Sequence, residues 1–498
     1  MARTNGESFV LTRRLITTRS DASYLDKKMR IVERLYNTGV KHCIHLLSEI
    51  RKDVWYQYAI KMYQNSKNQN EQKIWAEEIF LVAANYGLTE YDIHTYLGKG
   101  KTNAYQGGIG INIVQKTGTR LYAGVKKALF GKRLHYCRFG ATESFEDKRA
   151  NSGIIYHPKT DTVSVMGHEI RLKQCRQTDH YMQEAMLHKI RYCRIVRRAF
   201  GTSYRYFVQF VMEGSAPRKL TPGNNKIGLD PGVSTMTAYS GDKLHFIELS
   251  KDAGSYTKQI VHLQRVYDHQ IRVNNPECFH KDGTFRKGSK IHYTKGMYRT
   301  AMRLKTAYRK RSVYVKRSNG YDTNRLIESG TTLILEPMTY RNLARRSRAI
   351  ARQDKSSDIK DKRGNSKQIC KYKRRRRFGH SILIHSPSAF ISQLESKTMK
   401  YGGICETVNT AQYKASQYNH VTDEYEKHGL SDRYKQIGEY IVQRDCYSAF
   451  LLYHKKDPAH VNRTECINDF DNFLNCQEVL VATGIVNPNF GLTKGIAA

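Results

Sequence analysis

Three acidic residues stand next to apolar segments of the 498-residue chain, where a charged group is costly. Asp230 ends the apolar run KIGLD, Glu336 ends TTLILE, and Asp445 opens the amphipathic stretch RDCYSAFLL. Acids at the ends of buried strands can converge at one edge of a sheet. Carboxylates brought together in this way repel one another, so they need a cation to stay ionised. Oxygen ligands select Mg²⁺ or Mn²⁺, and two such ions about 4 Å apart can activate water for phosphodiester cleavage.

Each acid also has a simpler structural explanation. Asp-Pro-Gly is a common turn sequence, a Glu at a strand end is often solvated, and Asp445 could cap a helix. The ordered set of three is therefore stronger evidence than any one of them.

The segments around the acids predict an α/β unit. Short apolar runs predict strands, and longer runs with apolar residues three or four apart predict helices. The order strand, strand, strand, helix, strand, helix is that of a ribonuclease H-like fold. The predicted strands are 226–230, 235–240, 243–249, 331–336 and 402–410, and the predicted helices are 252–275, 291–318, 387–400 and 443–455.

The first half of the chain has a different pattern. A strand is predicted at 8–17, helices at 22–95 and 112–131, and a glycine-rich break at 99–112. Short β-like runs then return, and turn residues such as PKTD separate some of them. These runs predict a small barrel or sandwich. They are KRLHYCRF, GIIYHP, TVSVMG, HEIRL, YCRIVRRAF and YRYFVQFVM.

The charge of the chain indicates a polyanionic partner. Lys and Arg number 84 against 45 Asp and Glu, a net charge of +39. Such an excess repels itself in a compact protein unless a polyanion neutralises it, and nucleic acid is the first candidate, ahead of an anionic membrane surface. No apolar run reaches the roughly 18 residues of a membrane span, and no apolar signal core begins the chain. The expected location is the prokaryotic cytosol, with the nucleoid.

Two basic runs account for much of this charge. Residues 285–317 hold twelve Lys or Arg and no acid, and residues 341–377 hold sixteen against three Asp. Neither run has enough acids for salt bridging within a helix, so we predict phosphate contacts. A solvated helix face or a tail is the alternative. The candidate nucleic-acid-binding residues are Lys290, Lys295, Arg299, Arg303, Lys305, Arg309, Lys310, Arg311, Arg341, Arg345, Arg346, Arg374, Arg375, Arg376 and Arg377.

The segments IGLDPGVSTMTAYSG, LILEPMTYRNLARRS and VQRDCYSAFLL resemble the three RuvC motifs of the TnpB family and of the related type V CRISPR effectors. The resemblance implies that Asp230, Glu336 and Asp445 form a catalytic triad that binds two Mg²⁺ or Mn²⁺ ions. It also implies RNA-guided cleavage of double-stranded DNA at a single RuvC site. In such effectors base pairing reads the target and the protein reads a short adjacent motif.

The resemblance further implies a domain order, with a wedge barrel, a helical recognition domain and a RuvC domain. The expected divisions are the first wedge strand at 1–21, the recognition domain at 22–131, the wedge barrel at 132–222, RuvC motifs I and II at 223–402, a target-loading lobe at 403–442, and motif III with the C-terminal tail at 443–498.

The chain departs from the family at two places. The lobe at 403–442 lacks the four cysteines of a zinc ribbon, and His420 and His428 are too few to replace them. We therefore expect no zinc there, and a lobe held by the packing of Tyr413, Tyr418, Tyr425, Tyr434 and Ile437. In the third motif Tyr447 stands where the family often has Asn.

Two other functions remain open at this point. One is a nuclease-inactive, RNA-guided DNA-binding regulator, and the other is a strand-transfer transposase that needs no guide. The sequence also leaves open whether the guide comes from a transposon end or a CRISPR array. A monomer and a homodimer on one RNA are both compatible with the sequence.

Overall fold

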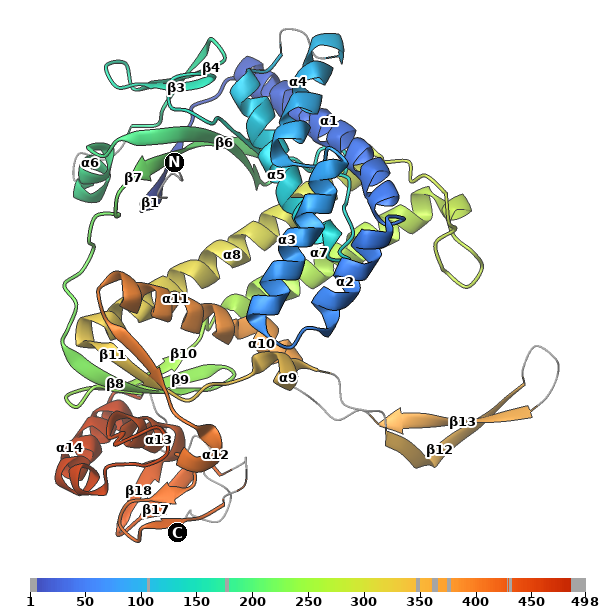
Figure 1. The fold of residues 1–498 in the computed structure, drawn as a ribbon. Helices are drawn as coiled ribbons and strands as arrows, with labels where there is room; N and C mark the ends of the chain where they lie inside the picture. The colour runs from blue at the N-terminus through green and yellow to red at the C-terminus, as the bar shows by residue number, and fades with distance from the viewer. Residues whose placement is uncertain are drawn as a thin grey trace. The chain divides into compact units, whose positions relative to one another are not determined.

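The chain forms a mixed α/β protein with several separate sheets, seen in a computed structural model (Figure 1). The structure describes residues 7–104, 108–174, 179–345, 350–360, 366–373, 378–427, 429 and 432–484. The chain divides into two compact units, residues 1–219 and 220–498. No helix among the described residues is long and apolar enough to cross a membrane.

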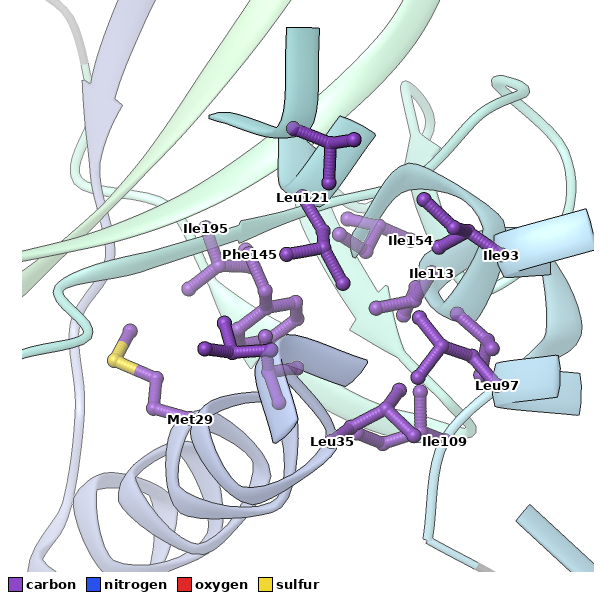
Figure 2. Packing of buried hydrophobic residues seen from close by; sticks show 14 of the residues in the cluster. Met29, Leu35, Ile93, Leu97, Ile109, Ile113, Leu121, Phe145, Ile154 and Ile195 are labelled. Atoms are coloured by element: carbon purple, nitrogen blue, oxygen red, sulfur yellow. The ribbon is translucent and has the colours of Figure 1, made fainter. Parts of the chain in front are cut away.

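Five helices make up much of the first unit. The capping box of Thr18 and Asp21 begins the longest of them, because each side chain accepts a hydrogen bond from the other's backbone N–H. Buried residues of these helices share one core with strands of the same unit, as the packing of Met29, Leu121 and Phe145 shows (Figure 2). The helices are α1 (Arg19–Ile50), α2 (Val54–Asn65), α3 (Gln69–Asn85), α4 (Glu90–Ala104) and α5 (Ile111–Leu129).

The strands of the first unit form two open sheets. One has four antiparallel strands in the order β1-β7-β6-β2, and the other has three in the order β3-β4-β5. A bridge between Leu15 and Leu172 joins the ends of the two sheets. The bounds are β1 (Ser8–Arg14), β2 (Ser144–Glu146), β3 (Ile154–His157), β4 (Thr162–Val165), β5 (His168–Arg171), β6 (Ile190–Phe200) and β7 (Ser203–Glu213), with helix α6 (His180–Met186) before β6.

The predicted barrel is therefore wrong as a closed structure. Its strands exist, but the described strands pair into separate open sheets and no ring of strands closes. The segment KRLHYCRF (132–139) is not a strand, and α4 continues through Gly98 to Ala104 where a glycine-rich break was expected.

A five-stranded mixed sheet organises the second unit. Its order is β10-β9-β8-β11-β14, with antiparallel pairing on the β10 side of β8 and parallel pairing on the β14 side. All five strands coincide with strands predicted from the sequence. They are β8 (Asn225–Pro231), β9 (Thr235–Tyr239), β10 (Leu244–Glu248), β11 (Gly330–Leu335) and β14 (Ile404–Thr407).

Helices cover both faces of this sheet. Leu229 and Leu335 point to one face, where they pack with residues of α8 (Lys295–Ser329) and α11 (Pro387–Lys400). Helix α13 (Arg444–Tyr453) lies against the other face, together with α14 (Arg463–Ala482), which lies beside α13 in Figure 1. Helix α7 (Ala253–Asn274) runs beside α8. The sheet is thus the middle of three layers, and the ends of its strands lie between the two layers of helices.

Smaller elements complete the second unit. The hairpin β12 (Ile350–Lys360) and β13 (Ser366–Lys373) pairs with no other described strand. The remaining elements are η1 (Pro276–Cys278), α9 (Tyr340–Ala344), α10 (Gly379–His385), α12 (Thr410–Tyr413), β15 (Tyr418–Asn419), β16 (Glu424–Tyr425), β17 (Tyr434–Ile437) and β18 (Tyr440–Gln443).

Candidate active site

The five-stranded sheet of the second unit, called the central sheet below, has a register that brings Asp230 and Glu336 to the same edge. Strands β8 and β11 are parallel and pair Leu229 with Leu335, so the next residues, Asp230 and Glu336, are neighbours at the carboxyl ends of the two strands. Adjacent strands lie about 4.8 Å apart. Because side chains alternate along a strand and both leucines face α8 and α11, both acids face the layer of α13.

Helix α13 brings the third acid to the same place. Asp445 lies in its first turn, which begins after Gln443, whose side chain accepts a hydrogen bond from the backbone N–H of Cys446 at 2.6 Å. The hydroxyl of Thr237 donates to the backbone oxygen of Asp445 at 2.8 Å, and Thr237 is paired with Asp230 across β8 and β9. Asp445 is therefore tied through the side chain of Thr237 to β9, the strand that pairs with β8 at Asp230.

Gly228 allows this close approach of helix and sheet. A Cβ atom at this position would collide with the backbone oxygen of Ala449 and the backbone nitrogen of Tyr453, both in α13. Backbone atoms cannot rotate away as a side chain can, so any substitution at Gly228 must displace α13. The glycine lies two residues before Asp230 on the same face of β8.

The other two carboxylates affect the pKa of Asp230. Burial raises the pKa of Asp230 well above its usual value, the charges of Asp445 and Glu336 raise it further, and Arg444 partly opposes this. Burial also raises the pKa of Glu336. Among the described residues, no hydrogen bond reaches the carboxylate of Asp230. Its negative charge would therefore have to be neutralised by a cation or a proton.

Two arginines accompany the third acid. The carboxylate oxygens of Asp445 lie 3.4 Å from a guanidinium nitrogen of Arg444 and 3.6 Å from one of Arg433. The amide of Gln443 also lies 3.4 Å from this carboxylate. Negative charge at Asp445 is thus balanced by side chains, whereas that of Asp230 is not.

The donor set fits a hard divalent cation by its chemistry. Three carboxylates supply the oxygen ligands that Mg²⁺ and Mn²⁺ prefer. Among the described residues, however, no group of three or more His, Cys, Asp or Glu side chains is close enough to hold a metal ion as it stands. Asp230, Glu336 and Asp445 are the residues that would hold one after their side chains move closer together.

Most of the described basic candidates lie on exposed positions. Along α8 and just before it, the side chains of Lys290, Lys295, Arg299, Arg303, Lys305 and Lys310 are exposed, and Arg309 is half-buried. Arg341 and Arg345, near α9, are exposed as well. Three tyrosines that alternate with the basic residues are also exposed, namely Tyr293, Tyr298 and Tyr308.

The remaining basic candidates fall into two groups. Arg311 has a structural contact, because its guanidinium donates to the backbone oxygens of Leu383 and Ile384 in α10. Arg346, Arg374, Arg375, Arg376 and Arg377 lie outside the described residues.

The lobe at 403–442 is held by a core that includes a buried lysine. Tyr413, Tyr418 and Ile437 are buried as expected, whereas Tyr425 is exposed and Tyr434 is half-buried. The ammonium group of Lys435, only 3% exposed, donates to the backbone oxygens of Gln417 and Tyr418, at 3.0 Å each.

Tyr447 belongs to this core. It does not belong to the edge of the five-stranded sheet at which Asp230, Glu336 and Asp445 meet, which we call the acidic edge. Its hydroxyl lies 2.6 Å from Nδ1 of His420 and accepts a hydrogen bond from the backbone N–H of His420. Tyr447, which stands where the expected motif often has Asn, therefore joins α13 to the lobe through His420.

Sequence reasoning missed the residues that position the acids. Thr237, Gln443 and Arg433 act through spatial contacts that no spacing in the sequence indicates. Arg444 directly precedes Asp445, and this adjacency was the one available signal.

The fold resembles that of a type V CRISPR effector. Cas12f1 in a complex with sgRNA and target DNA aligns with a TM-score of 0.50 and 10% identity, over 89% of this chain and 84% of that chain. A Cas12f ternary complex (TM-score 0.28, 11% identity, 89% and 83% covered) and a Cas12i–crRNA–dsDNA complex (0.24, 10%, 92% and 64%) match more weakly. No family model matches the sequence, and no curated protein matches it.

Proposed function

We propose that this protein is an RNA-guided DNA endonuclease of the RuvC type. A guide RNA would pair with one strand of a double-stranded DNA target next to a short motif. A single site at the acidic edge would then hydrolyse DNA phosphodiester bonds. The fold shared with an effector bound to guide RNA and DNA supports this assignment.

The observation that carries the proposal is the arrangement of the three acids. Asp230 and Glu336 end neighbouring parallel strands, α13 places Asp445 beside them, and the other two acids raise the pKa of Asp230. The strand order, three antiparallel strands followed by two parallel ones, is that of a ribonuclease H-like sheet. A protein with no chemistry at this edge gains nothing from crowding three carboxylates there.

Two divalent ions bound by the three acids would supply an activated water and stabilise the leaving oxygen. The chain's own residues contribute position and charge. Thr237 and Gln443 hold Asp445 at the edge, and Arg433, 43% exposed and 3.6 Å from Asp445, is placed to meet an incoming phosphate. The exposed cations of α8 would contact the nucleic-acid backbone.

The test begins with the RNA that co-purifies with the full chain. That RNA is sequenced, and a plasmid library carrying its complement beside random flanking bases is offered with Mg²⁺. We expect cleavage of a subset that shares a flanking motif, and loss of cleavage with EDTA. The variant Asp230→Ala should bind the same targets without cutting them. Asp268→Ala, which removes an exposed carboxylate paired with Arg272, is the matched control and should cut normally.

Two outcomes would replace the proposal. Guided binding without cleavage by the wild-type protein would identify a regulator, and described acids that stand too far apart to hold a metal ion are compatible with such a protein. Joining of DNA ends without any RNA would identify a transposase.

A further inference from the structure

A pocket of about 190 Å³ lies in the first unit, beside the edge strand β2 of the four-stranded sheet. Its lining includes Tyr36 of α1, Lys116 and Arg120 of α5, Glu146 of β2 and Arg194 of β6. Glu146 and Arg194 are paired with each other at 2.5 Å, so the acid in this group is already neutralised. Sites for drug-sized ligands start at about 300 Å³, so this pocket has room for one flat group and not for a whole cofactor.

Two other cations of the pocket, Lys116 and Arg120, have no salt bridge among the described residues. Each lies over an aromatic ring instead. Nζ of Lys116 is 4.4 Å from the ring centre of Tyr192. The guanidinium carbon of Arg120 is 5.5 Å from the ring centre of Tyr36. The positive charge of both side chains is therefore available to a phosphate group, and the rings lie next to it.

One face of the four-stranded sheet repeats this combination of cations and rings. Ile195 of β6 points into the core (Figure 2), so Arg198, three residues further along the strand, points to the other face. Arg205 of β7 is paired directly with Arg198 across the two strands. The guanidinium of Arg198 lies 4.9 Å from the ring centre of Phe207, and that of Arg205 lies 4.3 Å from the ring centre of Phe200.

This arrangement indicates an anionic partner with flat groups. Like charges directly opposite each other destabilise a sheet, so the pair of Arg198 and Arg205 has a cost that a bound anion would remove. Arg194 lies four residues before Arg198 on the same face and also borders the pocket, so pocket and sheet face form one surface. Unpaired bases stack on aromatic rings and guanidinium planes, and their phosphates bind cations.

We propose that this surface binds an unpaired segment of RNA, and that the pocket takes one base turned out of the strand. The base lies against the ring of Tyr36, and the phosphates beside it contact Lys116 and Arg120. The hydroxyl groups of Thr142 and Ser144, which also line the pocket, can bond a ribose 2′-OH, the group that distinguishes RNA from DNA. That this RNA is the guide rests on the proposed function. A duplex fits the surface poorly, because its bases are stacked on one another.

The test measures the affinity of the full-length, RNA-free chain for a short fluorescent RNA without internal pairing, by fluorescence anisotropy at fixed salt. Every protein carries Asp230→Asn, so the result does not depend on cleavage and stands even if the proposed nuclease activity fails. We expect the RNA to bind more tightly than DNA of the same sequence, and a free mononucleotide to compete poorly. RNA that contains 5-iodouridine should cross-link under ultraviolet light to the peptide of Tyr36 or Tyr192.

Two variants and one matched control decide the assignment. Lys116→Gln and Arg205→Gln should each weaken RNA binding about tenfold. Arg205→Gln should also leave the unfolding temperature equal or higher, because the repulsion of Arg198 is removed. Lys126→Gln is the control, since this exposed lysine lies on the same helix as Lys116 and over the ring of Tyr122, at 5.3 Å, but does not line the pocket. It should change the affinity less than about twofold.

Three outcomes would overturn the proposal. Equal effects of Lys116→Gln and Lys126→Gln would mean that only the overall charge attracts the RNA. Equal affinities for RNA and DNA would remove the assignment to RNA. A free mononucleotide that binds as tightly as the strand, with the same dependence on Lys116, would identify a site for a small ligand.

Discussion

Two aspartates, one in each unit, show how differently a protein can treat a carboxylate. Asp147 in the first unit is completely buried, and its oxygens accept hydrogen bonds from the hydroxyl of Ser152 and the backbone N–H groups of Lys148, Gly153 and Ile154, at 2.5–3.0 Å. Asp230 in the second unit is less buried, yet receives no hydrogen bond from a described residue and faces two further acids.

The difference separates a structural carboxylate from the one that we propose to be functional. Backbone donors stabilise the charge of Asp147, so its burial organises the loop before β3. Burial and the two neighbouring acids disfavour the charged form of Asp230 and raise its pKa, and carboxylates with such raised pKa values cluster at functional sites. Burial alone would have favoured Asp147 over Asp230 as the candidate functional residue.

The largest expected effect is on cleavage. Glu336→Gln keeps the shape of the side chain but removes one carboxylate of the proposed metal site, so the cleavage rate should fall at least about a hundredfold. The stability of the metal-free protein should stay equal or rise, because repulsion of Asp230 is relieved. Plasmid cleavage rates and urea unfolding measure the two effects. Normal cleavage would remove Glu336 from the site.

The opposite result is expected for the structural carboxylate. Asp147→Ala leaves several buried backbone N–H groups without acceptors, and should lower the free energy of unfolding by about 3 kcal/mol. Urea denaturation of the full chain measures this change, with Glu184→Ala, at an exposed acid of α6, as the control. A loss below about 1 kcal/mol would mean that water satisfies the same donors.

The comparison extends to buried bases of the second unit. Burial lowers the pKa of His245 and of His420 to about 4, whereas an unfolded chain has a histidine pKa near 6.5. The unfolded state binds more protons between these values, so stability is complete above about pH 6.5 and falls as the pH is lowered toward 4.

The expected loss is about 2–3 kcal/mol for each of the two histidines. Urea midpoints at pH 7.5, 6 and 5 give the slope, and His245→Gln should reduce it. An unchanged slope would show that the ring is already solvated in the folded protein.

The smallest effect is expected at the buried cation of the lobe. Lys435→Met keeps the aliphatic stem but leaves the carbonyls of Gln417 and Tyr418 without their donor, which should cost about 1–2 kcal/mol. Lys427→Met, at an exposed lysine of the same lobe, is the control. Thermal unfolding compares them. Equal stability would mean that tyrosine packing alone holds the lobe.

The central sheet could be predicted from the sequence because its signals are local. Short apolar runs mark β8, β9 and β11, and each acid stands directly at the end of such a run or at the start of the amphipathic α13. The parallel register that places Glu336 beside Asp230 is not local, but follows once both strands enter one sheet.

The failures have a common physical cause, which is competition from distant side chains. The segment 132–139 alternates like a strand, yet Asn37 of α1 takes both backbone groups of Cys137, and nearby Glu33 takes the N–H groups of Gly140 and Thr142. These hydrogen bonds take the place of those that the backbone would make with a neighbouring strand. Similarly, packing of α4 against α5 outweighs the cost of about 1 kcal/mol for a glycine inside a helix.

The close contact of α13 with Gly228 has a consequence for reading mutational data. A saturation scan scored on activity would rank Gly228 with the three acids, although it carries no functional group, because every replacement is obstructed by the backbone of α13. Such a scan would therefore place beside the three acids a position that touches neither a substrate nor an ion. Screening the same library for folded protein in parallel would distinguish Gly228, whose replacement displaces α13, from the three acids.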